Sequence, residues 1–217
     1  MTGQLIYENK GHFPDSKGST LGTLKVESWE KSPRWRFTRV IFTFTDGSRL
    51  LFNDLRKFGW IKIVSETDLP KIFRETGVEP LSRNFTLTRF TEIIARYPKR
   101  KIKSLLLDQK LIAGLGNIYT DESCFLAGIL PTRIIKSLTL DNRKKLHSAI
   151  IKVLKLAISK KGTSARDYVR ANGQPGSFVP YLNVYGRDQK NCKICGAKIS
   201  KIKLNGRGTH FCAHCQK

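Results

Sequence analysis

Acidic residues are scarce in this chain. Its 217 residues include 17 Asp and Glu against 40 Lys and Arg, which gives a formal net charge of +23 at pH 7. An excess of this size indicates a polyanionic partner, most simply a nucleic acid. Because the charges are spread through globular-looking sequence, we expect the partner to dock on a folded surface. An anionic membrane is the alternative, but no stretch combines a basic face with an exposed aromatic face.

A secretory leader and a long apolar run are also lacking, and cysteines are few. Without such a leader, disulfides are the less favoured use of the five cysteines, and we expect a reducing cytoplasm. Cys124 lies in an apolar setting and is predicted to be a core residue.

The other four cysteines form two CxxC pairs separated by sixteen residues. Each pair offers two thiolates on one tight turn, and two such turns complete the tetrahedral cage of a structural zinc site. The sequence therefore predicts one structural Zn²⁺, with two disulfides as the alternative. The predicted ligands are Cys192, Cys195, Cys212 and Cys215.

The segment between the pairs is predicted to be a β-hairpin. Residues 198–203 and 207–211 are its arms, Asn205-Gly206 is a two-residue turn signal, and Arg207 lies just past the turn. His210 and His214 could also bind zinc, but four thiolates already complete the site.

The rest of the chain predicts an α+β protein. Alternation from Phe37 to Phe44, a turn at Asp46-Gly47 and apolar residues 50–52 predict strands, as do residues 1–7 and 59–64. Since the first strand has no lead-in, we expect part of this β-domain to lie upstream. Helical periodicity predicts helices over residues 87–97, 102–110, 117–127 and 141–160, then a loop over 162–188 with a short strand at 183–185.

Residues 109–119 carry two glycines between predicted helices, Gly114 and Gly116. Glycine permits a close backbone approach, and Asn117 could cap the next helix, whose free amides would then bind phosphate. The alternative is a helical joint that needs glycine only for packing.

Several motifs resemble the formamidopyrimidine-DNA glycosylase family, in order and over essentially the whole chain. Residues 109–122 (QKLIAGLGNIYTDE) with 127–131 (AGILP) resemble its helix–two-turn–helix element. Residues 184–187 (VYGR) and 206–212 (GRGTHFC) resemble its zinc finger, and residues 54–59 (DLRKFG) resemble the end of its N-terminal β-domain.

The resemblance implies a fold and a function. The fold is a partial N-terminal β-sandwich (1–66), a linker (67–88), a helical helix–two-turn–helix domain (89–187) and a zinc-finger hairpin (188–217). The function is removal of oxidised purines, such as 8-oxoguanine and formamidopyrimidines, from duplex DNA, followed by nicking of the strand. A monomer in the bacterial cytoplasm, associated with the nucleoid, is implied as well.

Residue roles are implied by the same resemblance. Met1, Arg56 and Phe58 would fill the space left by the flipped base. Arg207 would grip the lesion's phosphates and assist elimination. Phosphate contacts are implied for Lys110, Gly116, Asn117 and Tyr119, and lesion recognition for the loop residues Ala165, Arg166, Asp167 and Tyr168.

The chain departs from the family where the covalent chemistry resides. The resemblance implies an N-terminal proline nucleophile, a following glutamate and a β-domain lysine, whereas residues 1–3 are Met-Thr-Gly. Phe37 stands where many members carry a DNA-contacting histidine. Two alternatives therefore stay open, a non-catalytic protein that binds damaged DNA and a zinc-ribbon RNA-binding protein. Apart from the resemblance, Phe58 could instead be a core aromatic.

Overall fold

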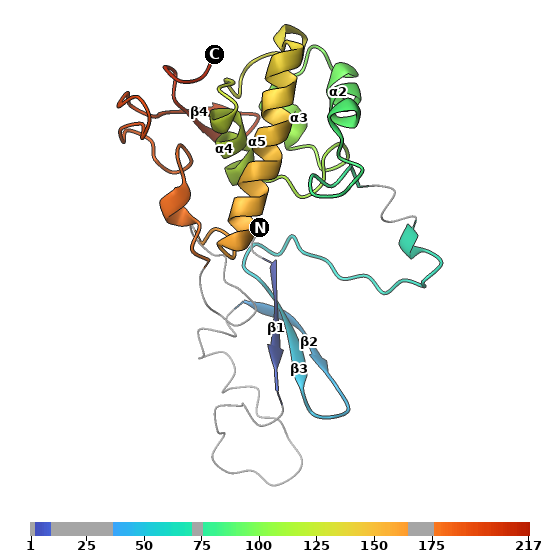
Figure 1. Cartoon of the computed structure of the whole chain (residues 1–217). Coiled ribbons are helices and arrows are strands. Elements are labelled where there is room, and N and C mark those ends of the chain that lie inside the picture. Colours follow the sequence, from blue (N-terminus) through green and yellow to red (C-terminus); the bar gives the residue numbers. More distant parts are fainter. Residues whose placement is uncertain (1–2, 10–36, 71–75, 165–175) are drawn as a thin grey trace. The chain divides into compact units, whose positions relative to one another are not determined.

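The computed structural model describes residues 3–9, 37–70, 76–164 and 176–217. The chain divides into two compact units (Figure 1). One comprises Met1–Ile63 with Lys161–Ser177, here called the sheet unit. The other comprises Val64–Lys160 with Phe178–Lys217, here called the helical unit. The predicted mixture of strands and helices is confirmed.

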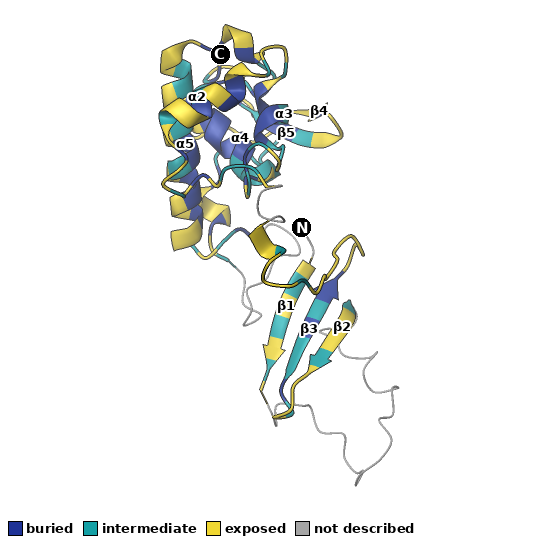
Figure 2. Ribbon diagram, turned by 90° about the vertical axis from the view of Figure 1, so that its right-hand side faces the viewer, coloured by how far each residue is buried: buried dark blue, intermediate teal, exposed yellow. Residues whose placement is uncertain are grey.

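The sheet unit contains an antiparallel three-stranded sheet in the order β1-β3-β2. Its strands are β1 (Gly3–Glu8), β2 (Thr38–Thr43) and β3 (Arg49–Asp54). The predicted turn at Asp46 joins β2 to β3, and the Asp46 carboxylate accepts hydrogen bonds from the Ser48 amide and hydroxyl at 2.8 and 2.7 Å. β3 is the central strand, and its Leu51 is buried (Figure 2).

The strand predicted over residues 59–64 is wrong. These residues form no regular element and pair with no strand in the described part of the chain. Trp60 and Ile63 are 73% and 93% exposed. Apolar alternation indicates a surface suited to burial, but a strand also needs a neighbour for its amides, and β1 and β2 already occupy both sides of β3.

The helical unit packs helices around one apolar core and carries a two-stranded hairpin. Phe90, Ile94 and Leu106 on α2 and α3 are fully buried in this core. The unit's elements are α2 (Leu87–Ala95), α3 (Ile102–Leu106), α4 (Asn117–Leu126), η2 (Ile135–Ser137), α5 (Leu140–Ser159), η3 (Val179–Tyr181), β4 (Ser200–Leu204) and β5 (Arg207–Phe211).

The longest helix, α5, confirms the periodicity on which it was predicted. Thr139 and Asn142 form a reciprocal capping box that starts it. One apolar face of the helix is buried, while Lys144, Lys145, Lys152 and Lys155 on its other faces are exposed. The buried residues of this face are Leu146, Ile150, Val153, Leu154 and Ala157.

Cys124 on α4 is buried as predicted. Burial raises the pKa of its thiol, so Cys124 is neutral and behaves as an apolar side chain.

Two further predictions about elements are corrected. The helix predicted over residues 102–110 ends at Leu106, because Asp108 accepts backbone hydrogen bonds from Leu111 and Ile112 and turns the chain. The strand predicted at 183–185 is absent, because the amides of all three residues donate to the carboxylate of Glu122.

Candidate zinc centre and nucleic-acid interface

The four predicted cysteine ligands converge on one point. Their Sγ atoms lie within 4.8 Å of one another, with 3.9 Å between Cys192 and Cys215 and 3.5 Å between Cys195 and Cys212. Four thiolates about 2.3 Å from a tetrahedral zinc lie about 3.8 Å apart, whereas a disulfide needs about 2.05 Å. The thiols are therefore free and spaced for zinc.

The protein backbone favours the ionised thiolate that zinc requires at one of these positions. Burial opposes ionisation of Cys192, but hydrogen bonds from the amides of Cys195 and Ile194 lower its pKa to about 7. The donor set and its spacing fit one structural zinc ion.

The hairpin beside the zinc ligands presents Arg207. Leu204 pairs with Arg207 across the turn, where Asn205 and Gly206 have φ values of 47° and 74°. Positive φ at both positions is typical of a type I′ turn, as the Asn-Gly signal predicted. The Asn205 side chain donates to the Ser104 hydroxyl at 2.8 Å, so the turn is tied to α3. Arg207 is exposed at the start of β5.

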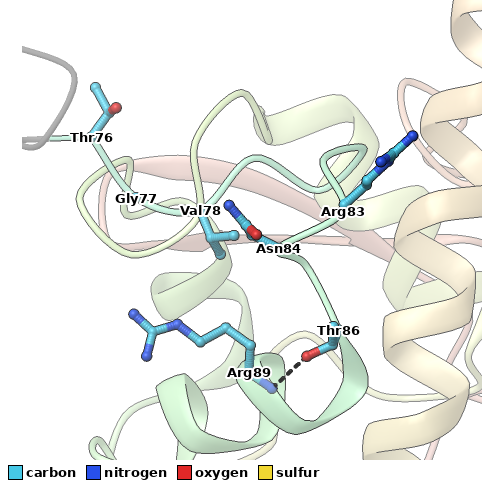
Figure 3. A pocket seen from close by; sticks show the side chains of 7 residues that line it. All are labelled: Thr76, Gly77, Val78, Arg83, Asn84, Thr86 and Arg89. Carbon is cyan, nitrogen blue, oxygen red and sulfur yellow. Dashed lines mark hydrogen bonds between the residues drawn. The ribbon is translucent and has the colours of Figure 1, made fainter. Parts of the chain in front are cut away.

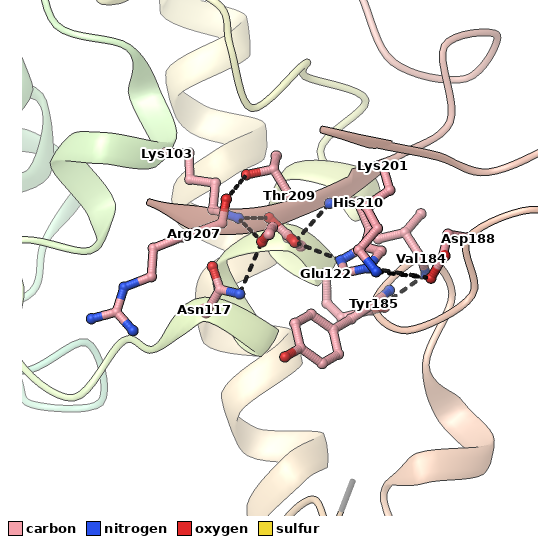
Figure 4. Close-up of polar contacts among 12 residues, drawn as sticks. Lys103, Asn117, Glu122, Val184, Tyr185, Asp188, Lys201, Arg207, Thr209 and His210 are labelled. Atoms are coloured by element: carbon pink, nitrogen blue, oxygen red, sulfur yellow. Dashed lines mark hydrogen bonds and ion pairs between the residues drawn. The ribbon is translucent and has the colours of Figure 1, made fainter. Parts of the chain in front are cut away.

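A buried ion pair fixes β5 against the helices (Figure 4). The Lys103 ammonium lies 2.6 Å from the Asp121 carboxylate, and the two side chains are 1% and 0% exposed. Lys103 also donates to the carbonyl of Gly208 at 3.0 Å, and Asp121 accepts from the amide of His210 at 2.9 Å. Burial lowers the pKa of Lys103, and the adjacent carboxylate opposes that shift. This pair sets the position of the strand that carries Arg207.

Asn117 does not cap α4, contrary to the prediction. Gly116 is the N-cap residue, and Asn117 is the first helical residue. The Asn117 side chain donates to the carbonyl of Gly208 at 3.0 Å, so it joins the start of α4 to β5 (Figure 4).

The loop before α4 has the features of a phosphate site. Within the described residues the N-cap residue of α4, Gly116, makes no side-chain cap hydrogen bond, and a helix N-terminus favours a negatively charged group such as phosphate. Gly114 adopts a φ of 75°, and its amide donates to the Gln109 side chain at 2.8 Å. Lys110 and Gly116 are both exposed. Tyr119 is half-buried and packs edge-on against Phe178, with 5.8 Å between ring centroids.

In the sheet unit, two of the three predicted wedge residues, Arg56 and Phe58, lie side by side on one exposed loop. The Phe58 side chain is 69% exposed, which excludes the core-aromatic alternative. The Arg56 guanidinium carbon lies 4.8 Å from the centroid of the Phe58 ring. Met1 and the predicted lesion loop, Ala165, Arg166, Asp167 and Tyr168, lie outside the described residues.

Sequence reasoning gave no role to three residues that build the site, Lys103, Asp121 and Glu122. Glu122 is 2% exposed, and its two oxygens accept from the amides of Asn183, Val184 and Tyr185 at 2.9–3.0 Å. The sequence did offer a signal for two of them. Asp121 and Glu122 are adjacent acidic residues within the α4 segment of a chain that has few acidic residues.

A pocket near α2 is a separate feature (Figure 3). Thr86 caps α2 there by accepting a hydrogen bond from the Arg89 amide at 3.1 Å. The predicted site residues do not line this pocket, whose walls are formed by Thr76, Gly77, Val78, Arg83, Asn84, Thr86 and Arg89.

Comparisons with known proteins match both parts of the helical unit. The family model of the formamidopyrimidine-DNA glycosylase H2TH domain matches residues 76–169, and that of the zinc finger found in FPG and IleRS matches residues 189–217. The formamidopyrimidine-DNA glycosylase of Listeria monocytogenes is 42% identical over 184 residues, which cover 84% of this chain and 67% of that protein. The chain belongs to the formamidopyrimidine-DNA glycosylase family.

Other relatives support membership of the same family. The formamidopyrimidine-DNA glycosylase of Geobacillus kaustophilus is 44% identical over 182 residues, or 83% of this chain and 66% of that protein. The chain thus spans about two thirds of the length of the curated relatives it matches. The Lactococcus lactis Fpg in complex with abasic-site DNA superposes with a TM-score of 0.82 at 34% identity, covering 100% of this chain and 72% of that one.

A further solved structure, MutM in complex with DNA containing carbocyclic 8-oxo-G, gives a TM-score of 0.80 at 34% identity. It too covers 100% of this chain and 72% of the matched chain. Among the described residues, no helix has the length and apolar character that a membrane span requires.

Proposed function

We propose that this chain binds damaged double-stranded DNA and serves a base-excision-repair glycosylase and AP lyase that removes oxidised purines. The observation that carries the proposal is the placement of Arg207. A zinc hairpin presents it, and the Lys103–Asp121 pair and Asn117 hold the adjacent Gly208 carbonyl against α3 and α4. This brings an exposed guanidinium and a helix N-terminus without a side-chain cap onto one compact unit, which suits neighbouring phosphates.

In this proposal the helical unit binds the DNA backbone. Lys110, the Gly116 amide and Asn117 contact phosphates at the start of α4, and Arg207 contacts those of the lesion through its planar fork. Tyr119 contributes at the same helix start, although part of its ring packs on Phe178.

The sheet unit supplies the wedge. Phe58 and Arg56 enter the space left by the flipped base, with Met1 beside them, because an aromatic ring and a planar guanidinium replace lost stacking and pairing. The loop with Ala165, Arg166, Asp167 and Tyr168 recognises the flipped base. Relatives solved with Fapy-dG, 8-oxo-G and abasic-site DNA support these substrate classes.

Borohydride trapping tests the covalent step. An amine nucleophile attacks the sugar C1′, displaces the base and forms an iminium, and Arg207 assists the later elimination. Residues 1–3 offer no N-terminal proline, so we expect this chain to shift a duplex with one abasic site without a covalent adduct. An adduct would show that another amine of this chain acts as nucleophile. Reading the coding DNA upstream of Met1 for an in-frame Pro-Glu start completes the test.

A non-catalytic protein that binds damaged DNA is the second candidate. It predicts a shift without strand cleavage even when any upstream coding sequence is included. A zinc-ribbon RNA-binding protein would instead prefer structured RNA to damaged duplex, and an exposed Arg56–Phe58 pair has no use in it.

We also propose a monomer in the bacterial cytoplasm, close to the nucleoid, and domain boundaries after residues 66, 88 and 187.

A further inference from the structure

The loop that presents Arg56 and Phe58 is closed by one buried carboxylate. Asp54, the last residue of β3, is 3% exposed. Its Oδ1 accepts from the Arg56 amide at 3.1 Å, and its Oδ2 accepts from the Gly59 amide at 2.6 Å. A carboxylate that accepts from two backbone amides makes charge-assisted hydrogen bonds, which are stronger than neutral ones.

The backbone of Asp54 is fixed to the sheet. The Asp54 amide donates to the Phe37 carbonyl at 2.8 Å, and the Asp54 carbonyl accepts from the Arg39 side chain at 3.1 Å. The position of the loop is therefore set by β2 and β3 through Asp54.

The loop has an unfavourable backbone conformation at Lys57 and a crowded one at Gly59. Lys57 has a φ of 56°, a left-handed conformation that is unfavourable for a residue with a side chain. At Gly59, an added Cβ would lie 2.4 Å from the Phe52 ring and 3.0 Å from the Asp54 carboxylate. Such a conformation persists only where the surroundings impose it, and the contacts of Asp54 supply that constraint.

The loop conformation places the large side chains of Arg56 and Phe58 next to each other at the surface. Phe58 is 69% exposed, and the Arg56 guanidinium is 4.8 Å from its ring centroid. Ordering both in advance lowers the entropic cost of placing them in a nucleic-acid stack.

We propose that Asp54 is a positioning residue: by closing the 54–59 loop it places Arg56 and Phe58, and so sets the preference for damaged over intact duplex. This inference rests on the proposed function. Asp54 does not touch DNA and acts through the two side chains that do.

The test compares Asp54→Asn with Asp46→Asn. Asp46 also closes a turn by accepting a backbone amide, in the β2–β3 hairpin of the same unit. Both changes remove one negative charge, so they alter the net charge of the chain by the same amount. The quantity measured is the ratio of dissociation constants for an intact duplex and for one with an abasic-site analogue.

We expect Asp54→Asn to lower that preference about tenfold, the order of one lost base–aromatic stacking contact. Asp46→Asn should keep the wild-type ratio. A fluorescent 2-aminopurine placed opposite the lesion brightens when an inserted side chain unstacks it. This increase in fluorescence on binding should be smaller with Asp54→Asn. In an Arg56→Ala/Phe58→Ala background, Asp54→Asn should cause no further loss, which a general structural defect would not produce. Gly59→Ala disturbs the same loop without changing the carboxylate and should give the same pattern.

The outcomes separate the two levels of inference. A wild-type chain without any preference for the damaged duplex would refute the proposed function. A wild-type preference that survives in both Asp54→Asn and Gly59→Ala would overturn the role of Asp54. Loss of the folded sheet in both variants would make Asp54 a folding residue and overturn it too.

Discussion

The substitution Lys103→Met probes the buried pair that holds β5. The two side chains are 1% and 0% exposed, so removing the ammonium leaves the Asp121 charge in the interior without its cation. Breaking one partner of a buried ion pair costs about 3–5 kcal/mol. Since a domain is stable by roughly 5–15 kcal/mol, the helical unit should lose between about a fifth and all of its stability. The Gly208 carbonyl would also lose the Lys103 hydrogen bond, which loosens the strand that carries Arg207.

The assay is urea unfolding followed by two signals. Helical circular dichroism reports the helical unit. All three tryptophans, Trp29, Trp35 and Trp60, lie in the segment Met1–Ile63, so their fluorescence reports the sheet unit. We expect Lys103→Met to lower the dichroism midpoint and leave the fluorescence midpoint unchanged.

The double variant Lys103→Met/Asp121→Leu is the control for the unpaired charge. It should be more stable than Lys103→Met alone, because no buried charge is left unpaired. A stability of Lys103→Met within about 0.5 kcal/mol of wild type, the range of ordinary surface changes, would refute the reasoning.

Three other outcomes follow from the structure. Chelating the zinc should unfold the hairpin and abolish DNA binding while the helical dichroism persists, and a metal-free sample that binds damaged duplex normally would contradict this. Affinity should fall steeply with salt, and Arg207→Ala should reduce the slope of log K against log salt by about 1; an affinity that is equal at low and moderate salt would argue against phosphate binding. Glu122→Gln should weaken the anchoring of three amides by about 2 kcal/mol, seen as faster hydrogen exchange at Val184, and unchanged exchange there would show that the carboxylate is dispensable.

Local signals in the sequence predicted the zinc ligands and the main helices. The spacing within each CxxC pair places two thiols on one turn. The apolar residues of α5 from Leu146 to Ala157 recur with the helical period. The Asn205-Gly206 turn was readable for the same reason, since only the local backbone decides it.

The contacts that assemble the site were not readable in this way. Lys103 and Asp121 lie 18 residues apart and meet only when α3 and α4 pack. The amides of residues 183–185 bind a carboxylate instead of a strand, and residues 59–64 have no neighbour to pair with in the described residues. Both strand predictions failed because alternation describes a side-chain pattern and not the partner of the backbone.

The most direct test of the central claim is a competition gel shift with purified, zinc-loaded chain. The competitors are a duplex with one abasic-site analogue, the same duplex intact, and a structured RNA of equal length. The account predicts preferential binding to the damaged duplex, weakened by Arg207→Ala and kept by Lys193→Ala, a surface lysine of the same zinc finger whose ammonium contacts the Pro180 carbonyl. Equal affinity for all three, or a preference for the RNA, would contradict the assignment of this surface to damaged DNA.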